Sequence, residues 1–225
     1  MKIKILEKGP YLVSADVPLH LEAITTDKKG TSLGWQITKT YPIQKEEYAL
    51  CRCGHSKNKP FCDGMHEDVH FEGTEVATHD TDYDNIVRYE GPDVTLEDEE
   101  SLCAVLRFCD RGIQVWNAAE AGGEENTKLA IEEACCCAAG RLRIIDKDGK
   151  TIEPDLNKEI SAIQDTAEDC RGPLWVKGGI EIEGADGRLY KVRNRITLCR
   201  CGESRNMPFC DATHLQCSHM QGLDK

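Results

Sequence analysis

The sequence predicts a β-rich α+β fold in which two copies of one small β module flank an α+β insert. A sixteen-residue loop that begins at Cys51 recurs at Cys199, and every matched position is 148 residues further along the chain. Short β-prone runs lead into each copy, whereas the stretch between the copies contains helical patterns. We therefore expect a first module over residues 1–70, an insert over residues 71–165 and a second module over residues 166–225.

The composition is that of a globular chain with reduced cysteines. The 225 residues are 40% hydrophobic and carry a net charge of -12, which argues against nucleic-acid binding and suits docking onto a basic partner. No apolar run approaches the roughly 20 residues of a membrane span, and residues 1–7 lack a signal peptide's apolar stretch. We therefore expect no membrane contact and a cytoplasmic location. The 13 cysteines are then expected to be metal ligands or reduced thiols rather than disulfides.

Both modules are expected to consist of short strands ahead of the repeated loop. In the first copy, residues 9–13 and 34–38 are β-prone, residues 27–30 have turn chemistry, and residues 47–50 alternate into the loop. In the second copy, residues 172–176 mirror the first run, residues 185–188 predict a hairpin turn, and residues 190–198 alternate. From the Gly-Pro pair to the loop, the first copy takes 41 residues (10 to 51) and the second takes 26 (173 to 199). The first copy therefore contains a 15-residue insertion.

The insert is predicted to contain two helices and a hairpin. Thr95 and Asp98 have the spacing of a helix N-cap box, so we expect a helix that continues through Leu102, Leu106 and Phe108. A second helix is expected over residues 124–139, closed by a glycine at position 140. Residues 141–145 and 151–152, with a turn between them, predict a hairpin. Because no Ser- or Pro-rich linker joins the insert to the modules, we expect it to pack against them.

Each loop places three thiols and an imidazole at the spacing C-x-C-x8-C-x3-H. The candidate metal ligands are Cys51, Cys53, Cys62 and His66 in the first loop, and Cys199, Cys201, Cys210 and His214 in the second. Thiolates bind iron–sulfur clusters or zinc, and imidazole suits either. Structural zinc sites usually have C-x2–4-C spacing, whereas two thiolates one residue apart suit one iron of a cluster whose other iron takes the third cysteine and the histidine. The spacing favours an iron–sulfur cluster, and a structural zinc site is the alternative.

The other residues of the loop suggest how it is shaped. Gly54 permits a turn, Pro60 restricts the backbone ahead of Cys62, and Asp63 can cap a short helix that carries the histidine. Ser56 has the position to donate a hydrogen bond to a cluster sulfur. An imidazole in place of a thiolate raises a cluster's reduction potential and adds a group that can take up a proton.

The two loops resemble the CDGSH iron–sulfur motif of the mitoNEET-like family, in its tandem form. Residues 62–66 read Cys-Asp-Gly-Met-His, and residues 210–214 read Cys-Asp-Ala-Thr-His. The resemblance implies one [2Fe-2S] cluster per loop, held by the eight candidate ligands, and a β-cap over a cluster-binding layer, with two modules related by a twofold axis. The resemblance covers about half of the chain. We expect no membrane anchor, in contrast to the outer-mitochondrial members of the family. Ala212 replaces a glycine, which matters if that backbone needs a positive φ.

The insert contains a weaker cysteine pattern. Cys103, Cys109 and Cys137 faintly resemble the ligands of divergent small ferredoxins that bind a three- or four-iron cluster, although Ala138 stands where their proline would be. On a helix, Cys103 and Cys109 would be about 240° apart and would not converge. We therefore expect these thiols to be small buried hydrophobic groups, and a third cluster held by Cys103, Cys109 and Cys137 is the alternative. Cys135, Cys136, Cys170 and Cys217 have no predicted role beyond packing.

The chain has no phosphate-binding loop, nucleophile elbow or dinucleotide fingerprint. We therefore expect a redox carrier rather than an enzyme: a soluble protein with two [2Fe-2S] clusters for electron transfer or cluster delivery. Its partner would be a redox protein or a cluster acceptor, and the two modules would pair within one monomer. The alternatives are a structural zinc-binding interaction module, and an oxidoreductase subunit with a third cluster in the insert.

Overall fold

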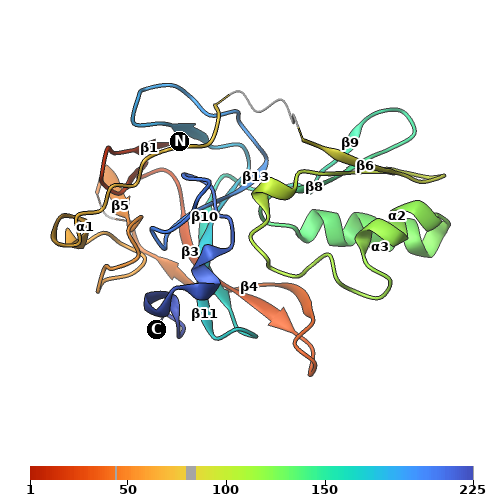
Figure 1. The fold of residues 1–225 in the computed structure, drawn as a ribbon, viewed down its shortest axis with the longest axis horizontal. Helices are drawn as coiled ribbons and strands as arrows, with labels where there is room; N and C mark the ends of the chain where they lie inside the picture. The colour runs from red at the N-terminus through yellow and green to blue at the C-terminus, as the bar shows by residue number, and fades with distance from the viewer. Residues whose placement is uncertain (44, 80–84, 225) are drawn as a thin grey trace.

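In the part of the chain that the structure describes, the fold is organised around three β-sheets (Figure 1). The computed structural model describes residues 1–43, 45–79 and 85–224. In chain order the elements are β1 (Lys2–Ile5), β2 (Tyr11–Ser14), β3 (Leu19–Thr26), β4 (Ser32–Tyr41), β5 (Glu47–Leu50), α1 (Met65–Asp68), β6 (Val87–Glu90), β7 (Thr95–Asp98), the 3-10 helix η1 (Glu100–Leu102), α2 (Val115–Ala121), α3 (Glu124–Cys136), β8 (Leu142–Ile145), β9 (Thr151–Ile152), β10 (Ile160–Asp165), β11 (Cys170–Lys177), β12 (Glu181–Glu183), β13 (Arg195–Leu198), and the 3-10 helices η2 (Thr213–Gln216) and η3 (Ser218–Met220).

The two modules exchange strands. The first sheet has the order β12-β1-β2-β5, and the second has the order β13-β11-β10-β3-β4. β12 comes from the second module and pairs in parallel with β1, whereas β3 comes from the first module and pairs in parallel with β10. β10 lies inside the range expected for the insert, residues 71–165, but it pairs with β11 and so belongs to the sheet of the second module. The other pairs in both sheets are antiparallel. Each half thus builds a sheet of its own strands and donates one strand to the sheet of the other half. β4 is an additional strand of the first module. This confirms the predicted α+β class with its pseudo-twofold pair of modules.

Both modules contribute to one apolar core. In β2 and β5 every second side chain is buried, as in strands with one solvated face, and in β10 all six residues are buried. Residues from the two halves, among them Tyr11, Leu50, Ile160, Leu174 and Leu198, belong to a single cluster of buried residues. Because neither half encloses a core of its own, strand exchange makes the halves one cooperative unit.

The insert differs from the prediction at its first element. Residues 95–98 form strand β7 rather than the start of a helix, because Glu97 and Asp98 bind arginines of the neighbouring strand region and Leu96 is fully buried. After η1, residues 103–107 belong to no helix or strand. The expected helix through Leu102, Leu106 and Phe108 is therefore wrong. These residues are buried in the shared core as part of an irregular segment.

The remaining insert elements agree better with the sequence. The second helix is confirmed as α3, and the hairpin is confirmed as β8 and β9. α3 ends earlier than expected because Cys137 is extended and Arg195 donates to the carbonyl oxygens of Ala134 and Cys137. The positive charge of Arg195 also interacts favourably with the negative end of the helix dipole at the C-terminus of α3. α2 was not predicted.

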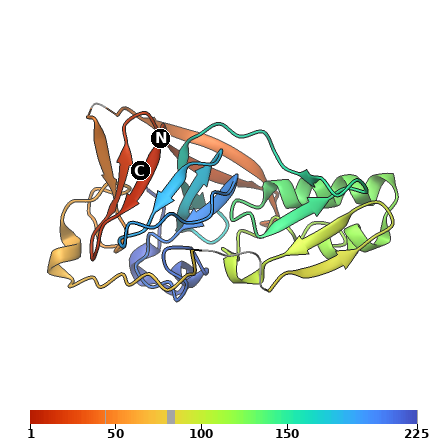
Figure 2. The same cartoon turned by 90° about the horizontal axis from the view of Figure 1, so that it is seen from above.

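The insert packs against the modules, as expected. The Ser32 hydroxyl donates to the Leu106 carbonyl oxygen at 2.8 Å, and the ring centroids of Trp35 and Phe108 are 4.7 Å apart. In Figure 2 the insert, coloured yellow to green, forms one end of an elongated molecule and the two modules form the other. No helix in the described part of the chain has the length and apolar character needed to cross a membrane.

Candidate metal centres

Each cysteine loop follows directly from a strand, β5 in the first module and β13 in the second. In the first loop, the Cys51 N–H donates to the Pro60 carbonyl oxygen at 2.8 Å, and the Cys62 N–H donates to the Ala49 carbonyl oxygen at 2.9 Å. The second loop repeats both bonds at 2.8 and 2.9 Å, between the matched residues Cys199 and Pro208, and Cys210 and Thr197. The two loops therefore have the same backbone design, with both ends tied to the preceding strand.

In each loop the four candidate donors come together as two pairs. In the first loop, the sulfur atoms of Cys51 and Cys53 are 3.9 Å apart, and the Cys62 sulfur is 3.4 Å from Nδ1 of His66. The corresponding distances in the second loop are 3.5 Å for Cys199 and Cys201, and 3.4 Å for Cys210 and His214. Two donors bound tetrahedrally to one metal ion lie roughly 3.5–3.8 Å apart. Each pair is therefore close to the separation that one metal ion requires.

The pairs do not merge into a mononuclear site. Across residues 1–43, 45–79 and 85–224, no group of three or more His, Cys, Asp and Glu side chains is gathered around a single point. The charge of Cys62 nevertheless raises the pKa of Cys53, after larger effects of Cys51 and of burial, and Cys210 acts on Cys201 in the same way. The two pairs of each loop are therefore neighbours.

The thiols of each C-x-C pair shift each other's pKa in opposite directions. Contact with Cys53 lowers the pKa of Cys51, and contact with Cys201 lowers the pKa of Cys199; the same contacts raise the pKa of the partner thiol. Backbone N–H groups of the turn also lower the pKa of the first thiol in each pair. One thiolate, the metal-binding form of cysteine, therefore forms readily in each loop.

The two histidines differ in their exposure to solvent. His66 lies on α1 and is partly exposed, whereas His214 lies on η2 and is 2% exposed. Burial, with a further effect from the charge of Arg200, lowers the pKa of His214 to about 4. The ring is therefore neutral at pH 7 and has an unprotonated nitrogen for a metal. Nε2 of His214 has no hydrogen-bond partner in the described part of the chain, so Nδ1, which faces Cys210, is the nitrogen placed to bind.

The two loops pack back to back. Cys51, Cys53, Cys199 and Cys201 belong to one buried cluster, together with Phe71, Met207, Cys217 and Met220. A Cβ on Gly54 would lie 2.5 Å from the Cys201 carbonyl oxygen, and one on Gly202 would lie 2.6 Å from the Cys53 carbonyl oxygen. Both glycines have a positive φ. Glycine is thus required at both positions by the turn and by the close approach of the opposite loop.

A buried arginine supports each loop from behind. Arg52 lies between the rings of Tyr11 and Phe71, 5.7 and 5.4 Å from their centroids, and donates to the carbonyl oxygens of Leu6 and Gly73. Arg200 donates to the carbonyl oxygens of Gly172 and Ile163 and to the Asp224 carboxylate. No role was predicted for these two arginines, although their occurrence at the same position of both copies was a usable signal.

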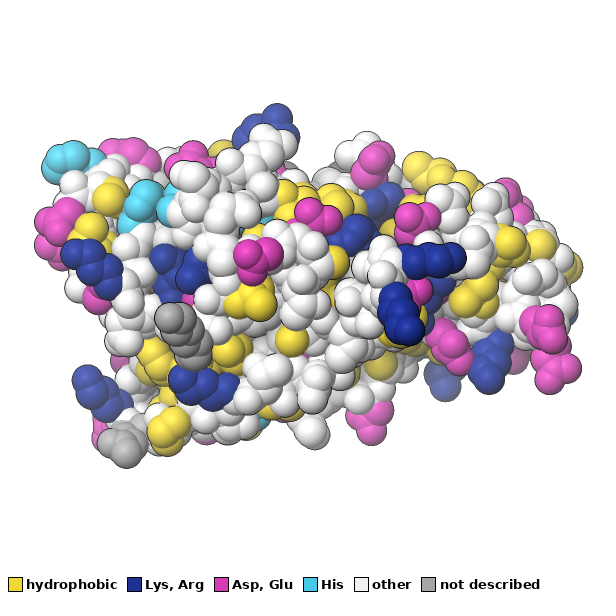
Figure 3. Space-filling view, turned by 90° about the horizontal axis from the view of Figure 1, so that it is seen from below, with side chains coloured by type: hydrophobic (Ala, Val, Ile, Leu, Met, Phe, Trp, Pro, Cys, Tyr) yellow, Lys and Arg dark blue, Asp and Glu magenta, His cyan; other side chains and the backbone are white. Residues whose placement is uncertain are grey.

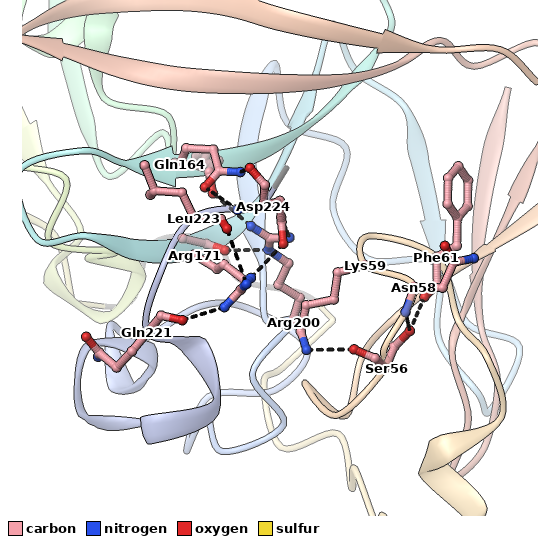
Figure 4. A network of polar contacts seen from close by, with 12 residues as sticks. Ser56, Asn58, Lys59, Phe61, Gln164, Arg171, Arg200, Gln221, Leu223 and Asp224 are labelled. Carbon is pink, nitrogen blue, oxygen red and sulfur yellow. Dashed lines mark hydrogen bonds and ion pairs between the residues drawn. The ribbon is translucent and has the colours of Figure 1, made fainter.

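The C-terminal segment is fastened beside the second loop (Figure 4). Asp224 accepts hydrogen bonds from Arg171 at 2.6 Å and from Arg200 at 3.0 Å, and Arg171 also donates to the carbonyl oxygens of Gln221 and Leu223. Further back in this segment, Nε2 of His219 lies 2.8 Å from the Cys201 carbonyl oxygen, and its ring lies 4.3 Å from that of His55. His219 and Cys217 thus belong to the surroundings of the sites, a role that their position in the sequence did not reveal.

Ser56, Asp63 and Ala212 contribute to the shape of the two loops. The Ser56 hydroxyl donates to the Phe61 carbonyl oxygen at 2.6 Å, so the prediction that it points to a cluster sulfur is wrong. Asp63 accepts from the N–H of Met65 at 3.2 Å, so it supports the short helix α1 from one position before its N-cap. Ala212 has a φ of 69°, so the alanine occupies a backbone conformation that favours glycine.

The comparison with protein families explains the repeat. The family model described as iron-binding zinc finger, CDGSH type, matches residues 8–67 and residues 171–215. Two regions of the chain therefore belong to this family, in tandem and separated by a helical insert. The family is an iron-binding one, which supports an iron–sulfur protein. The comparison with curated proteins found no match, and neither did the comparison with solved structures.

Proposed function

We propose that the protein holds two [2Fe-2S] clusters, one in each CDGSH loop, and carries electrons or clusters between proteins. The ligands would be Cys51, Cys53, Cys62 and His66 in the first loop and Cys199, Cys201, Cys210 and His214 in the second. The observation that carries the proposal is the arrangement of donors in two pairs, found in both loops. A cluster with two irons needs one pair of protein ligands on each iron, whereas a zinc ion needs all four donors around one point.

The chain's own residues suit this role. When bound, the cluster supplies one-electron redox chemistry, and a histidine ligand raises its potential relative to a thiolate. The buried arginines and the opposing loop hold the cysteines in place, so the protein need not reorganise around a bound group. His66, which is partly exposed, gives the first site a route to solvent that the buried His214 lacks.

The proposal includes a partner, a location and an assembly state. The partner would be a redox protein or a cluster acceptor that docks on an acidic surface, in keeping with the net charge of -12. On the face shown in Figure 3, acidic side chains are spread widely with basic ones among them. We further propose a cytoplasmic location, where thiols stay reduced, and a monomer whose modules, over residues 1–70 and 166–225, pair within the chain. In this role the protein is a carrier and does not convert a substrate into a product.

The test is metal analysis of anaerobically purified protein, combined with exchange of the histidines. We expect iron and acid-labile sulfide at the CDGSH loops, little zinc, and a visible spectrum. The double variant His66→Cys/His214→Cys should hold its clusters longer at pH 6 and have a lower potential, because a thiolate replaces a neutral ring. Colourless protein with about one zinc per loop would identify a structural zinc module instead. Unchanged decay and potential in the double variant would remove the histidines from the ligand set.

A further inference from the structure

Three cysteines of the insert line one cavity that lies outside the two CDGSH loops. Cys103 follows η1, Cys109 is six residues further on, and Cys137 follows the end of α3. All three contribute to the wall of a cavity of about 290 Å³. Since one water molecule occupies about 30 Å³ in the liquid, the cavity has room for a much larger group.

The backbone explains how these thiols converge. On a helix, Cys103 and Cys109 would have pointed in different directions, but the segment between them is irregular. Its backbone has a φ of 51° at Val105 and 60° at Arg107. These two bends bring both ends of the segment to the same cavity. Residues 103–107 belong to no helix or sheet, and the Cys103 N–H donates to the Glu100 carbonyl oxygen at 3.0 Å, which holds the start of the segment against η1.

The surroundings of the three thiols hold them in position. The Ser32 hydroxyl binds the Leu106 carbonyl oxygen from the first module, and Arg195 of the second module donates to the Cys137 carbonyl oxygen at 2.9 Å. These contacts from both modules fix the backbone of the segments that carry the thiols.

The cavity also contains cationic side chains with fixed positions. Arg107 lines it and binds the fully buried Asp165 carboxylate through two contacts of 2.6 and 2.8 Å. Arg141 lines it as well and binds the buried Asp98 carboxylate. Guanidinium groups held beside three thiols offset part of the negative charge of an anionic group bound by thiolates.

We propose that Cys103, Cys109 and Cys137 hold a third metal centre, a cuboidal iron–sulfur cluster of three or four irons. In such a cluster each iron takes its own thiolate, so the sulfur ligands stand apart around the cluster. This matches three thiols distributed around one cavity wall better than it matches a single ion. Asp110 also lines the cavity and offers an oxygen donor for a fourth iron.

The third centre lies beside the second CDGSH loop. Nδ2 of Asn206, in that loop, donates to the Ser101 carbonyl oxygen at 3.0 Å, two residues before Cys103. The charge of Cys103 is also one of the smaller influences that raise the pKa of Cys210, a candidate ligand of the second loop. This inference does not depend on the [2Fe-2S] assignment, because its ligands come from a different part of the chain.

The experiment is iron and sulfide analysis of the full chain after anaerobic reconstitution with ferrous iron and sulfide. We expect about seven or eight irons per chain in the parent and about four after Cys103→Ser, Cys109→Ser or Cys137→Ser. Cys135→Ser and Cys136→Ser are matched controls, since neither residue lines the cavity, and should keep the parent value. Electron paramagnetic resonance should show a cuboidal-cluster signal in the parent and controls that the first three variants lack.

Two further measurements keep the test independent of folding and of the CDGSH sites. The visible spectrum and thermal unfolding of each serine variant show whether the remainder of the protein is intact. The variant Cys51→Ser/Cys199→Ser disables one thiolate pair in each CDGSH loop and should still hold about three or four irons. About four irons in the parent, with no change in the Cys137→Ser variant, would overturn the third centre. Zinc in place of iron in the insert would also overturn it.

Discussion

The hydroxyl of Tyr11 in the first module donates a hydrogen bond to the carbonyl oxygen of Cys199 in the second, at a distance of 2.7 Å. The same hydroxyl lies 3.3 Å from the carbonyl oxygen of Pro208, which closes the second loop. The first module therefore holds the backbone of the second module's metal-binding loop. The two candidate sites are coupled through this contact as well as through the shared sheets.

Tyr11→Phe should weaken the second site selectively. Removal of the donor leaves two buried carbonyl oxygens less well satisfied, which costs about 1–3 kcal/mol. We expect a lower midpoint of thermal unfolding and faster loss of visible absorbance from the second loop. Tyr48→Phe is the control, because its hydroxyl donates to the Val17 carbonyl oxygen within the first module. Equal loss of absorbance in both variants would show that the cross-module bond has no particular role.

Gly54→Ala should separate the two loops. The new Cβ would lie 2.5 Å from the Cys201 carbonyl oxygen, and the residue has a φ of 81°. Gly149→Ala is a matched control, because the residue has a φ of 80° and no atom lies within 4 Å of the new Cβ. Its loss of stability should reflect only the cost of placing alanine in a left-handed backbone conformation, about 1–2 kcal/mol. We expect Gly54→Ala to be less stable than this control and to hold less iron. Equal stability and iron content in the two variants would contradict close packing of the loops.

Ala212→Gly should stabilise the second loop. Its φ of 69° is costly for alanine, and glycine removes this cost while adding some freedom to the unfolded chain, so the net gain is up to about 1 kcal/mol. The equivalent residue of the first loop, Gly64, has a φ of 94° with open space around a Cβ. Gly64→Ala should therefore lower the free energy of unfolding by a similar amount. Denaturant titration of both variants measures these changes, and a loss of stability in Ala212→Gly would refute the argument.

Glu133 should make the protein less stable as the pH rises. Burial raises the pKa of this carboxyl to about 7, with Asp110 adding to the rise, although the N–H and the charge of Arg111 lower it. Below pH 4.5 the group is protonated in both folded and unfolded states. Between pH 4.5 and 7 the unfolded chain ionises first, so folding becomes less favourable, and above pH 7 the full cost is present.

Glu133→Gln removes this titration. The variant should unfold at a higher temperature than the parent at pH 8, and the difference should shrink at pH 4. Each kcal/mol corresponds to about 2–4 °C for a chain of this size. Glu132→Gln, at an exposed position next to it on α3, is the control and should show no such pH-dependent difference. A constant difference between parent and Glu133→Gln at both pH values would contradict the raised pKa.

Much of the fold followed from local patterns in the sequence. The alternation before Cys51 and Cys199 predicted β5 and β13, and the helical pattern of residues 124–139 predicted α3, although the helix ends at Cys136 rather than directly before Gly140. The prediction for Thr95 and Asp98 was wrong because capping chemistry and strand chemistry overlap at these residues. Their environment decided between them: arginines from the β8 region bind Glu97 and Asp98 across the sheet.

The spacing of cysteine and histidine in the two loops predicted the candidate donor set and its repetition, since side chains a few residues apart on one turn are placed by local geometry. The tertiary structure decided which strands the modules exchange. It also buries His214 while leaving His66 partly exposed, and it brings the insert cysteines to one cavity. Cys103, Cys109 and Cys137 are brought to one cavity by contacts from Ser32 and Arg195, more than fifty residues away. Such contacts form only when distant segments pack together, so the periodicity of a short stretch of sequence cannot predict them.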